Sequence, residues 1–516
     1  MKNISIYTNK IRSKNDYFWA ASGLDDLYPI TYSEQGDFFL NRAQRLGTCR
    51  YVRNHHTFSK EIRYGYLRCG GDVYSEDENG NPIYDFTWIN GVYKKLLSYG
   101  VKPIVELDFL PEELIGNNGH ITQEGNNVKL SNQYYPNDWN KWSALLKAFM
   151  QNLVDEFGVE ELRTWYFEVW NEPDNWKIET WDMFFKLYDI FVDAVTSVDD
   201  KLRVGGPGCF RQHFMYAFLN HVVNGTNYVT GKKGSRIDFI SFHIYGMSGG
   251  WLDKYPLVMP TVQRFSQELA WKKRMINLYP RLKNTEFLLD EWGLISNYER
   301  SVSDLPMLEL RNSEFSALFL TKLVDTVLEH RHRYAFNITM LLYWGFANED
   351  FFGKLFNGNR SLTTKYNLCK PIQTAHEMLS LFGKNFVETN VIAGGDDGVI
   401  ATADENGAQA LVYFFNEFDV ERQFPPREYN VQFNGLSDGK YLLKLYTMDD
   451  THNNTYRLWQ RLGCPSNPTQ EQLDMLYKEQ DVSADVEKEV EVKDGIFNYS
   501  TTLSSVSMKL ISLKKL

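Results

Sequence analysis

The alternation of short apolar runs with longer amphipathic stretches is the feature of this 516-residue sequence that most constrains its fold. Short runs separated by helical stretches are typical of βα units around a parallel sheet, whose strands are buried on both faces. Eight such runs can be counted, and they predict eight strands. The runs are Phe18–Ser22, Cys49–Arg53, Lys102–Leu107, Trp165–Trp170, Leu202–Gly205, Ile237–His243, Glu286–Leu289 and Asn337–Tyr343.

The stretches between these runs have the periodicity of helices that pack on one side. In Asp138–Phe157 the apolar residues recur at steps of three and four, and Gly158 follows as a stop signal. Trp181–Val198 shows the same pattern. Eight strands with interposed helices over about 350 residues predict a (β/α)8 TIM barrel enlarged by loop insertions. A doubly wound open sheet is the alternative that this pattern leaves open.

The sequence pattern changes after about Gly383, where predicted short strands alternate with turns rich in Gly, Asp and Asn. This pattern predicts a C-terminal β-sandwich, with a short helix at Pro468–Gln480. A chain of this length exceeds what one hydrophobic core supports, so two domains are the natural expectation. The expected domains are a catalytic barrel at 13–383 and a β-sandwich at 384–516 that is completed by residues 1–12.

The composition and charge of the chain limit the kinds of molecule that it can bind. The net charge of −11 disfavours nucleic acid and anionic membrane surfaces, whereas a neutral sugar is compatible with it. No run approaches the roughly 20 apolar residues of a membrane helix, and the start has no signal-peptide pattern, so a cytoplasmic protein is expected. The sequence has no HExxH, Asp-rich loop or phosphate-binding glycine motif, so we expect no metal and no cofactor. Homo-oligomerisation stays open.

Two glutamates lie at the ends of predicted strands. Glu172 follows the fourth run and precedes Pro173, which lacks the N–H that would continue a strand. Glu291 follows the seventh run and precedes the glycine break at Gly293. In a (β/α)8 barrel the carboxyl ends of the strands form the active site. Two carboxylates at one barrel mouth are what glycosidic cleavage requires, so we predict Glu172 and Glu291 as the catalytic pair.

Two further glutamates, Glu106 and Glu168, lie inside their predicted strands. A carboxylate in a barrel interior needs a partner because an unpaired buried charge is costly. We therefore expect both to pair with Arg53 and not to act as catalysts.

Many stretches of the chain closely resemble glycoside hydrolase family 39, whose members include β-xylosidases and α-L-iduronidases. The Asn-Glu-Pro end of the fourth strand is common to a wider group of barrels, and the other stretches narrow the resemblance to this family. They include Tyr51–His55, Gly100–Leu107, Trp165–Pro173, Leu202–Pro207, Asp238–His243, Tyr343–Trp344 and Gly463–Pro465.

The resemblance implies that Glu172 is the acid/base and Glu291 the nucleophile of a retaining glycosidase. It also implies that Asn171 binds the sugar 2-hydroxyl. The other substrate-binding residues that we expect are His55, His243, Tyr245 and Trp344. A lone histidine at a strand end is equally often a hydrogen-bonded core residue, and a tryptophan there often only packs in the barrel.

The sequence departs from the pattern of the family's xylosidases at two places. It has Glu291-Trp292-Gly293 where they tend to have Glu-Tyr-Asn, and Phe351-Phe352 where acidic sugar-binding residues are expected. We expect both changes to alter the residues that recognise the sugar. The prediction is therefore a retaining exo-enzyme for short β-linked oligosaccharides, with β-xylosides as the best guess. Arabinopyranosidase, galactosidase or endo-acting activity is the alternative.

Two other classes of protein compete with this interpretation. Gly246–Gly250 satisfies the nucleophile-elbow pattern of serine hydrolases around Ser248, although the prolines that follow do not suit the helix that this motif requires. A non-catalytic sugar-binding protein would be expected to lack one of the two carboxylates, and both are present.

Overall fold

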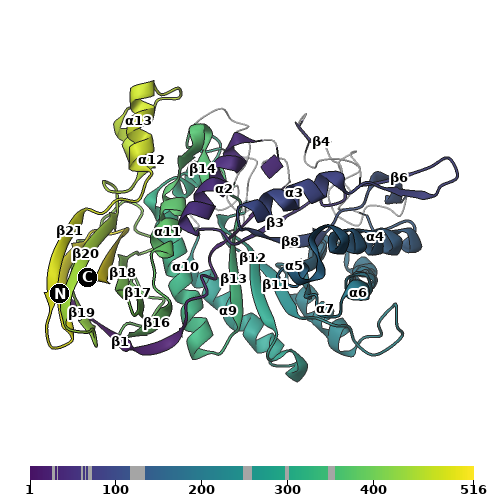
Figure 1. Cartoon of the computed structure of the whole chain (residues 1–516), viewed down its shortest axis with the longest axis horizontal. Coiled ribbons are helices and arrows are strands. Elements are labelled where there is room, and N and C mark those ends of the chain that lie inside the picture. The colour runs from purple at the N-terminus through teal and green to yellow at the C-terminus, as the bar shows by residue number, and fades with distance from the viewer. Residues whose placement is uncertain are drawn as a thin grey trace.

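The computed structural model describes residues 1–25, 30–31, 33–59, 62–63, 66–67, 73–116, 134–247, 259–296, 301–346 and 355–516. Eight parallel strands close into a barrel, and each of the eight predicted runs overlaps one of them (Figure 1). The predicted TIM barrel is thereby confirmed, and the open-sheet alternative is wrong. The barrel strands are β2 (Ala21–Leu24), β3 (Tyr51–Asn54), β8 (Lys102–Leu107), β9 (Tyr166–Val169), β10 (Val204–Cys209), β11 (Phe239–Met247), β12 (Glu286–Ile295) and β13 (Ile338–Trp344).

Amphipathic helices surround the barrel and turn their apolar faces toward it. In the predicted helix at 138–157 the side chain of Asp138 caps the first turn by accepting two backbone N–H groups, and Gly158 ends the helix. None of the described helices is long and apolar enough to cross a membrane. The longer helices of the barrel are α2 (Glu34–Leu46), α3 (Thr87–Ser98), α4 (Trp139–Phe157), α6 (Trp181–Val198), α7 (Gln212–Asn224), α9 (Val262–Ile276), α10 (Glu314–Arg333) and α11 (Pro371–Ser380).

Shorter hairpins and helices lie in the loops of the barrel domain. Among the described residues, three two-stranded hairpins and several short helices lie outside the eight barrel strands. The hairpins are β4 (Ile62–Arg63) with β5 (Tyr66–Leu67), β6 (Tyr74–Glu76) with β7 (Pro82–Tyr84), and β14 (Thr363–Thr364) with β15 (Leu368–Cys369). The short helices are α5 (Val159–Leu162), η1 (Glu112–Leu114), η3 (Pro173–Asn175), η4 (Ile178–Thr180), η5 (Pro280–Leu282), η6 (Pro306–Arg311) and η7 (Lys365–Asn367).

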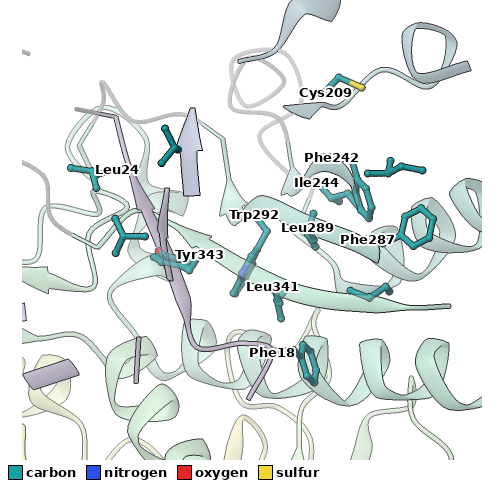
Figure 2. Packing of buried hydrophobic residues seen from close by; sticks show 14 of the residues in the cluster. Phe18, Leu24, Cys209, Phe242, Ile244, Phe287, Leu289, Trp292, Leu341 and Tyr343 are labelled. Atoms are coloured by element: carbon teal, nitrogen blue, oxygen red, sulfur yellow. The ribbon is translucent and has the colours of Figure 1, made fainter. Parts of the chain in front are cut away.

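The hydrophobic core of the barrel has two layers. The outer layer fills the space between strands and helices, and Figure 2 shows part of it, including Phe242, Leu289 and Trp292. The inner layer fills the barrel itself and includes Leu288 on β12 and Trp344 on β13. Above this inner apolar layer the interior carries buried charged side chains, which belong to the site described below.

A nine-stranded sheet forms the second domain, as predicted (Figure 1). Its two edge strands contact each other, so the sheet curls into a sandwich around its own apolar cluster. The strand order is β21 (Val486–Val492), β20 (Gly439–Met448), β23 (Ser507–Lys515), β18 (Gly407–Phe414), β17 (Asp397–Asp404), β16 (Asn385–Thr389), β1 (Lys2–Lys14), β19 (Arg427–Asn434) and β22 (Ile496–Leu503).

The N-terminal strand β1 belongs to this second sheet. It pairs antiparallel with β16 and parallel with β19, so it lies between two strands of the C-terminal region. The sheet also carries two helices, α12 (Thr455–Arg461) and α13 (Gln470–Glu479), of which only the second was predicted. The exact boundaries of the two domains stay a prediction.

Helix α10 lies between the barrel and the nine-stranded sheet. Asp325 on this helix is 8% exposed and accepts a 2.8 Å hydrogen bond from the hydroxyl of Tyr413 on β18. Burial raises the pKa of Asp325 to about 7, although the hydrogen bond from Tyr413 acts in the opposite direction. The contact between the two domains therefore contains a carboxyl group that prefers to be neutral.

We expect the substitution Asp325→Asn to stabilise the protein at pH 8 and to have little effect at pH 4. Because the folded-state pKa lies above the unfolded value, stability from this group is lost as the pH rises from about 4 to about 7. The amide stays neutral and still accepts from Tyr413, so the free energy of unfolding at pH 8 should rise by about 1–3 kcal/mol. Urea unfolding at both pH values measures the change, and equal effects at the two values would contradict the assignment.

Candidate active site

The two predicted catalytic glutamates lie close together at the carboxyl end of the barrel strands. Glu172 follows β9, with its backbone in the left-handed region at φ +46°, and its N–H donates to the carbonyl of Gly208 on β10 at 3.0 Å. Glu291 lies on β12. A carboxylate oxygen of each glutamate and a ring nitrogen of His243 all lie within 4.8 Å of one another. The barrel therefore brings together the residues that the strand ends predicted.

A β-bulge at Asp290 turns Glu291 into the barrel. On the neighbouring strand β11, Phe242 pairs with Leu289 and His243 pairs with Glu291, so β12 carries one extra residue at this point. The other neighbour, β13, shows the same irregularity. Leu288 and Asp290 face the interior, and regular alternation would turn Glu291 toward the outer helices. The extra residue reverses this orientation, as bulges near active sites commonly do.

The environment of Glu172 suits a general acid. Its Oε2 accepts a 3.1 Å hydrogen bond from the side chain of Asn175, and its Oε1 lies 3.0 Å from Nδ1 of His243. Burial raises the pKa of Glu172, against the opposing effects of Asn175 and Arg53. A carboxyl group in such a place holds its proton to higher pH than an exposed glutamate does, which is the property that a general acid needs.

The environment of Glu291 suits a nucleophile. The hydroxyl of Tyr245 donates to its Oε1 at 2.6 Å, and the Nη1 atom of Arg53 lies 3.5 Å from its Oε2. The Tyr245 ring reaches this position because residue 293 is glycine: a Cβ atom there would lie 2.9 Å from the ring. A hydroxyl donor and a guanidinium together orient the carboxylate and stabilise its charge.

Arg53 organises the buried charges beneath the two glutamates. It is fully buried and donates to Glu106 at 2.6 Å and to Glu168 at 2.9 Å, which are the two pairs that the sequence predicted. It also donates to the amide oxygen of Asn171 at 3.2 Å. The contact holds the Asn171 side chain in a fixed orientation beside Glu172.

His243 lies between the two glutamates. Its Nδ1 atom is 3.0 Å from Glu172 and 3.5 Å from Glu291, and the side chain is completely buried. Burial lowers the pKa of His243 to about 4, although the charge of Glu291 acts in the opposite direction. The imidazole is therefore neutral at neutral pH and adds no positive charge to the site.

His55 and Trp344 line the same region. Their rings lie 4.6 Å apart, and the Arg53 guanidinium lies 5.4 Å from the Trp344 ring. The Nδ1 atom of His55 is 2.7 Å from Glu106, and the indole N–H of Trp344 donates to Asp25 at 3.2 Å. Trp344 is only 1% exposed and belongs to the inner apolar layer. The sugar-contacting roles of these two residues stay predictions.

The sequence analysis missed two charged residues of the site. Arg360 is buried, donates to the hydroxyl of Tyr245 at 3.2 Å, and pairs with Asp25 at 2.6 Å. Asp25 directly follows β2, so its place at a strand end was a signal that could have identified it. Arg360 lies in the segment between β13 and β14, well beyond the carboxyl end of β13, and no local pattern marks it.

The structure corrects one expectation about the residues around the sugar. Trp292 lies in the outer layer (Figure 2) and is fully buried. Its ring contacts Phe265 and Phe319. It does not face the glutamates, because the bulge at Asp290 also reverses its orientation. Glu291 and Gly293 both lie inside β12, which continues to Ile295. The predicted break of the strand at Gly293 is therefore wrong. Ser248 and Phe351-Phe352 lie outside the described residues.

A second group of possible metal ligands lies beside the site, formed by His55, Glu106 and Asp108. The carboxylate oxygens that would bind a metal already accept hydrogen bonds within the protein. Glu106 accepts from Arg53, and Asp108 accepts the backbone N–H of Thr57 at 3.2 Å. We interpret this group as hydrogen-bonded support for the strands.

A (β/α)8 barrel whose mouth holds two carboxylates so close together defines a glycoside hydrolase. Glu172 follows β9 and Glu291 lies on β12, so both carboxyl groups lie at the same mouth of the barrel. The family model of glycosyl hydrolases family 39 matches residues 2–495. The chain therefore belongs to this family, as the sequence predicted.

Relatives of known activity cover most of the chain. It is 24% identical to the β-xylosidase of Geobacillus stearothermophilus over 484 residues, which is 90% of this chain and 86% of the relative. It is also 24% identical to the α-L-iduronidase of Homo sapiens over 505 residues, which is 88% of this chain and 70% of the relative. Among solved structures, a monomeric β-xylosidase from Caulobacter crescentus CB15 superposes with a TM-score of 0.79 at 23% identity, covering 100% of both chains.

Proposed function

We propose that this glycoside hydrolase retains anomeric configuration, with Glu172 as acid/base and Glu291 as nucleophile. The observation that carries the proposal is the distance between the two side chains: one oxygen of each lies within 4.8 Å of the other. Carboxyl groups about 5–5.5 Å apart are typical of retaining enzymes, whereas inverting enzymes need about 6.5–9.5 Å to admit a water molecule.

The first step forms a covalent intermediate. Glu291 attacks the anomeric carbon of the bound sugar while Glu172 gives its proton to the glycosidic oxygen. The bond between carbon and leaving oxygen breaks, and the alcohol departs with that proton. Burial of Glu172 favours this step because it keeps the proton on the acid until the leaving oxygen takes it.

The second step releases the sugar. Glu172, now ionised, takes a proton from a water molecule, and the resulting oxygen attacks the same anomeric carbon. The bond to Glu291 breaks, and both carboxyl groups return to their starting states. Tyr245 and Arg53 contact Glu291, so they are placed to stabilise its carboxylate each time it leaves the sugar.

For the substrate we propose short β-linked oligosaccharides cleaved from their ends, with β-xylosides as the best single candidate. The similarity to curated β-xylosidases over most of the chain supports this choice. The α-L-iduronidases are about equally similar, so an arabinopyranoside, a galactoside or another glycoside is the alternative. The Arg360–Asp25 pair beside Tyr245 also places a buried cation and a carboxylate near the nucleophile, where they affect which sugar fits.

The test follows product stereochemistry by NMR in the first minutes of hydrolysis. We expect aryl β-xyloside to have a higher kcat/KM than aryl α-L-arabinopyranoside, β-galactoside and β-glucoside, and its first product to be the β-anomer. Retention is expected because two displacements at one carbon restore its configuration. A first-formed α-anomer would refute the nucleophilic role of Glu291. A different preferred glycoside would change only the substrate, and rapid cutting within a polymer would refute the exo-acting part.

A further inference from the structure

Beneath the catalytic pair, one buried cation faces four carboxyl groups. Arg53 lies 2.6 Å from Glu106, 2.9 Å from Glu168, 3.3 Å from Asp290 and 3.5 Å from Glu291. All of these side chains are nearly or completely buried. A single guanidinium cannot balance four buried negative charges, so at least one of the carboxyl groups must carry a proton.

Hydrogen bonds distinguish three members of this cluster, which accept from donors, from the fourth, which does not. Burial raises the pKa of Glu106 as well, and the Arg53 cation acts in the opposite direction. Glu106 accepts from Arg53 Nη2 and lies 2.7 Å from a ring nitrogen of His55. Glu168 accepts from Arg53 Nε and from the hydroxyl of Ser241. Each of these carboxyl groups is supported by donors, as a buried carboxylate requires.

Glu291 is supported in the same way, since it accepts from Tyr245 at 2.6 Å and lies 3.5 Å from Nη1 of Arg53. That Nη1 atom and Oε2 of Glu291 make no hydrogen bond with any described residue, so their 3.5 Å contact is an ion pair. The side of the guanidinium that faces the nucleophile is therefore not shared with another carboxyl group.

Asp290 differs from the other three carboxyl groups. Neither of its oxygens accepts a hydrogen bond from any described residue. The Nε atom of Arg53 is 3.3 Å away but already donates to Glu168, and Nε2 of His243 is 3.7 Å away, beyond hydrogen-bonding distance. An ionised carboxylate without donors in this place would be costly. As a neutral acid, Asp290 becomes a donor and Glu168 the acceptor within its reach.

We propose that Asp290 is a neutral carboxylic acid that donates its proton to Glu168, and that it acts as a positioning residue for the nucleophile. Its role for Glu291 rests on the proposed function. Burial and the negative charge of Glu168 both raise the pKa of Asp290 well above its usual range, which agrees with the hydrogen-bond pattern. Glu291 also faces Asp290 and acts in the same direction, whereas the Arg53 cation acts in the opposite one.

The neutral state of Asp290 matters for the geometry of the nucleophile. An ionised Asp290 would compete with Glu291 for Arg53, because both carboxyl groups lie within 3.5 Å of the same guanidinium. With its proton, Asp290 instead holds Glu168 in place, and Glu168 holds Nε of Arg53. Nη1 of the guanidinium then stays directed at Glu291. The bulge makes this arrangement possible, because it places two consecutive acidic residues in the barrel interior.

Infrared difference spectroscopy of the full-length protein tests the protonation directly. At pH 8 we expect the C=O stretch of a protonated carboxyl group in the wild type, shifted in D2O and missing in Asp290→Asn. The matched control is Asp325→Asn, which removes another buried acid whose pKa is about 7. The band that Asp325 contributes should be present at pH 5 and largely absent at pH 8. If Asp290→Asn removes no such band at pH 8, the proposal is overturned.

Kinetics of two variants test the positioning role. Asp290→Asn keeps a donor toward Glu168, so kcat/KM should fall by less than about tenfold, with the acidic limb of the pH profile in place. Asp290→Leu keeps the branched shape of the side chain, although it is larger, and has no donor, so a further loss of at least about tenfold is expected. A shift of the acidic limb to lower pH in Asp290→Asn would show that a negative charge had been removed, and would overturn the proposal.

These measurements separate the two proposals. If Asp290→Leu does not fold, the infrared result and the pH profile of Asp290→Asn still test whether Asp290 is neutral. Should a 2-fluoro glycoside label a residue other than Glu291, the proposed function would fail, whereas the infrared band of Asp290 would be unaffected.

Discussion

Replacing Glu291 by glutamine is expected to lower kcat/KM by at least about 10⁴-fold. The amide keeps the shape and the contact with Tyr245 but cannot form the covalent bond to the sugar. Initial rates with an aryl glycoside measure the loss, and thermal unfolding checks the fold. Glu286→Gln is the matched control, because Glu286 lies on the same strand. Its side chain accepts a 2.9 Å hydrogen bond from the hydroxyl of Tyr166 inside the barrel. Its activity should stay within about threefold of the wild type.

A 2-fluoro glycoside provides the positive counterpart of this experiment. The fluorine slows both displacements, and a reactive leaving group lets the first one proceed, so the intermediate accumulates. Peptide mapping by mass spectrometry should place the label on Glu291. A label on another carboxyl group, or full activity of the glutamine variant, would refute the assigned role.

Replacing Glu172 by alanine should produce the second large effect. For substrates with poor leaving groups we expect kcat/KM to fall by about 10²–10⁴-fold, because the leaving oxygen no longer receives a proton. The alkaline limb of the pH profile should disappear with the group whose raised pKa sets it. For substrates with good leaving groups the second step should be affected more than the first. Rates measured between pH 4 and pH 9 test both expectations.

Azide distinguishes loss of an acid/base from general damage. As a small anionic nucleophile it needs no general base, so it should restore turnover of Glu172→Ala with a good leaving group and give a glycosyl azide. Glu179→Ala, an exposed substitution in the helical turn η4 that follows, is the control and should behave like the wild type. If azide restores nothing, the acid/base is another residue.

The barrel could be predicted from the sequence because its strands are buried on both faces. Each therefore appears as a short, mainly apolar run, such as Lys102–Leu107, that stands out between amphipathic helices. The position of Glu172 and Glu291 at one mouth could be predicted for a related reason, since polar residues at the carboxyl ends of such runs gather there. Their catalytic roles stay predictions. The pairs of Arg53 with Glu106 and Glu168 followed from the cost of burying a charge alone.

The orientation of side chains along β12 could not be predicted. Strict alternation from Leu288 would turn Trp292 toward the sugar and Glu291 toward the helices, and the observed orientation is the reverse. The cause is one extra residue, which no local pattern in Glu286–Ile295 reveals. Arg360 could not be found either, because its contact with Tyr245 joins two residues 115 positions apart in the sequence, and no local pattern predicts such a contact.

The position of β1 in the second sheet has a consequence for how the chain is made. Its partners β16 and β19 lie more than 370 residues further along the chain, so this strand cannot pair until both of them have been synthesised. Its apolar residues Ile4 and Ile6, buried in the finished protein, are exposed during that time. The nascent chain therefore carries an unpaired apolar strand until the second sheet is synthesised, and that sheet cannot close without β1.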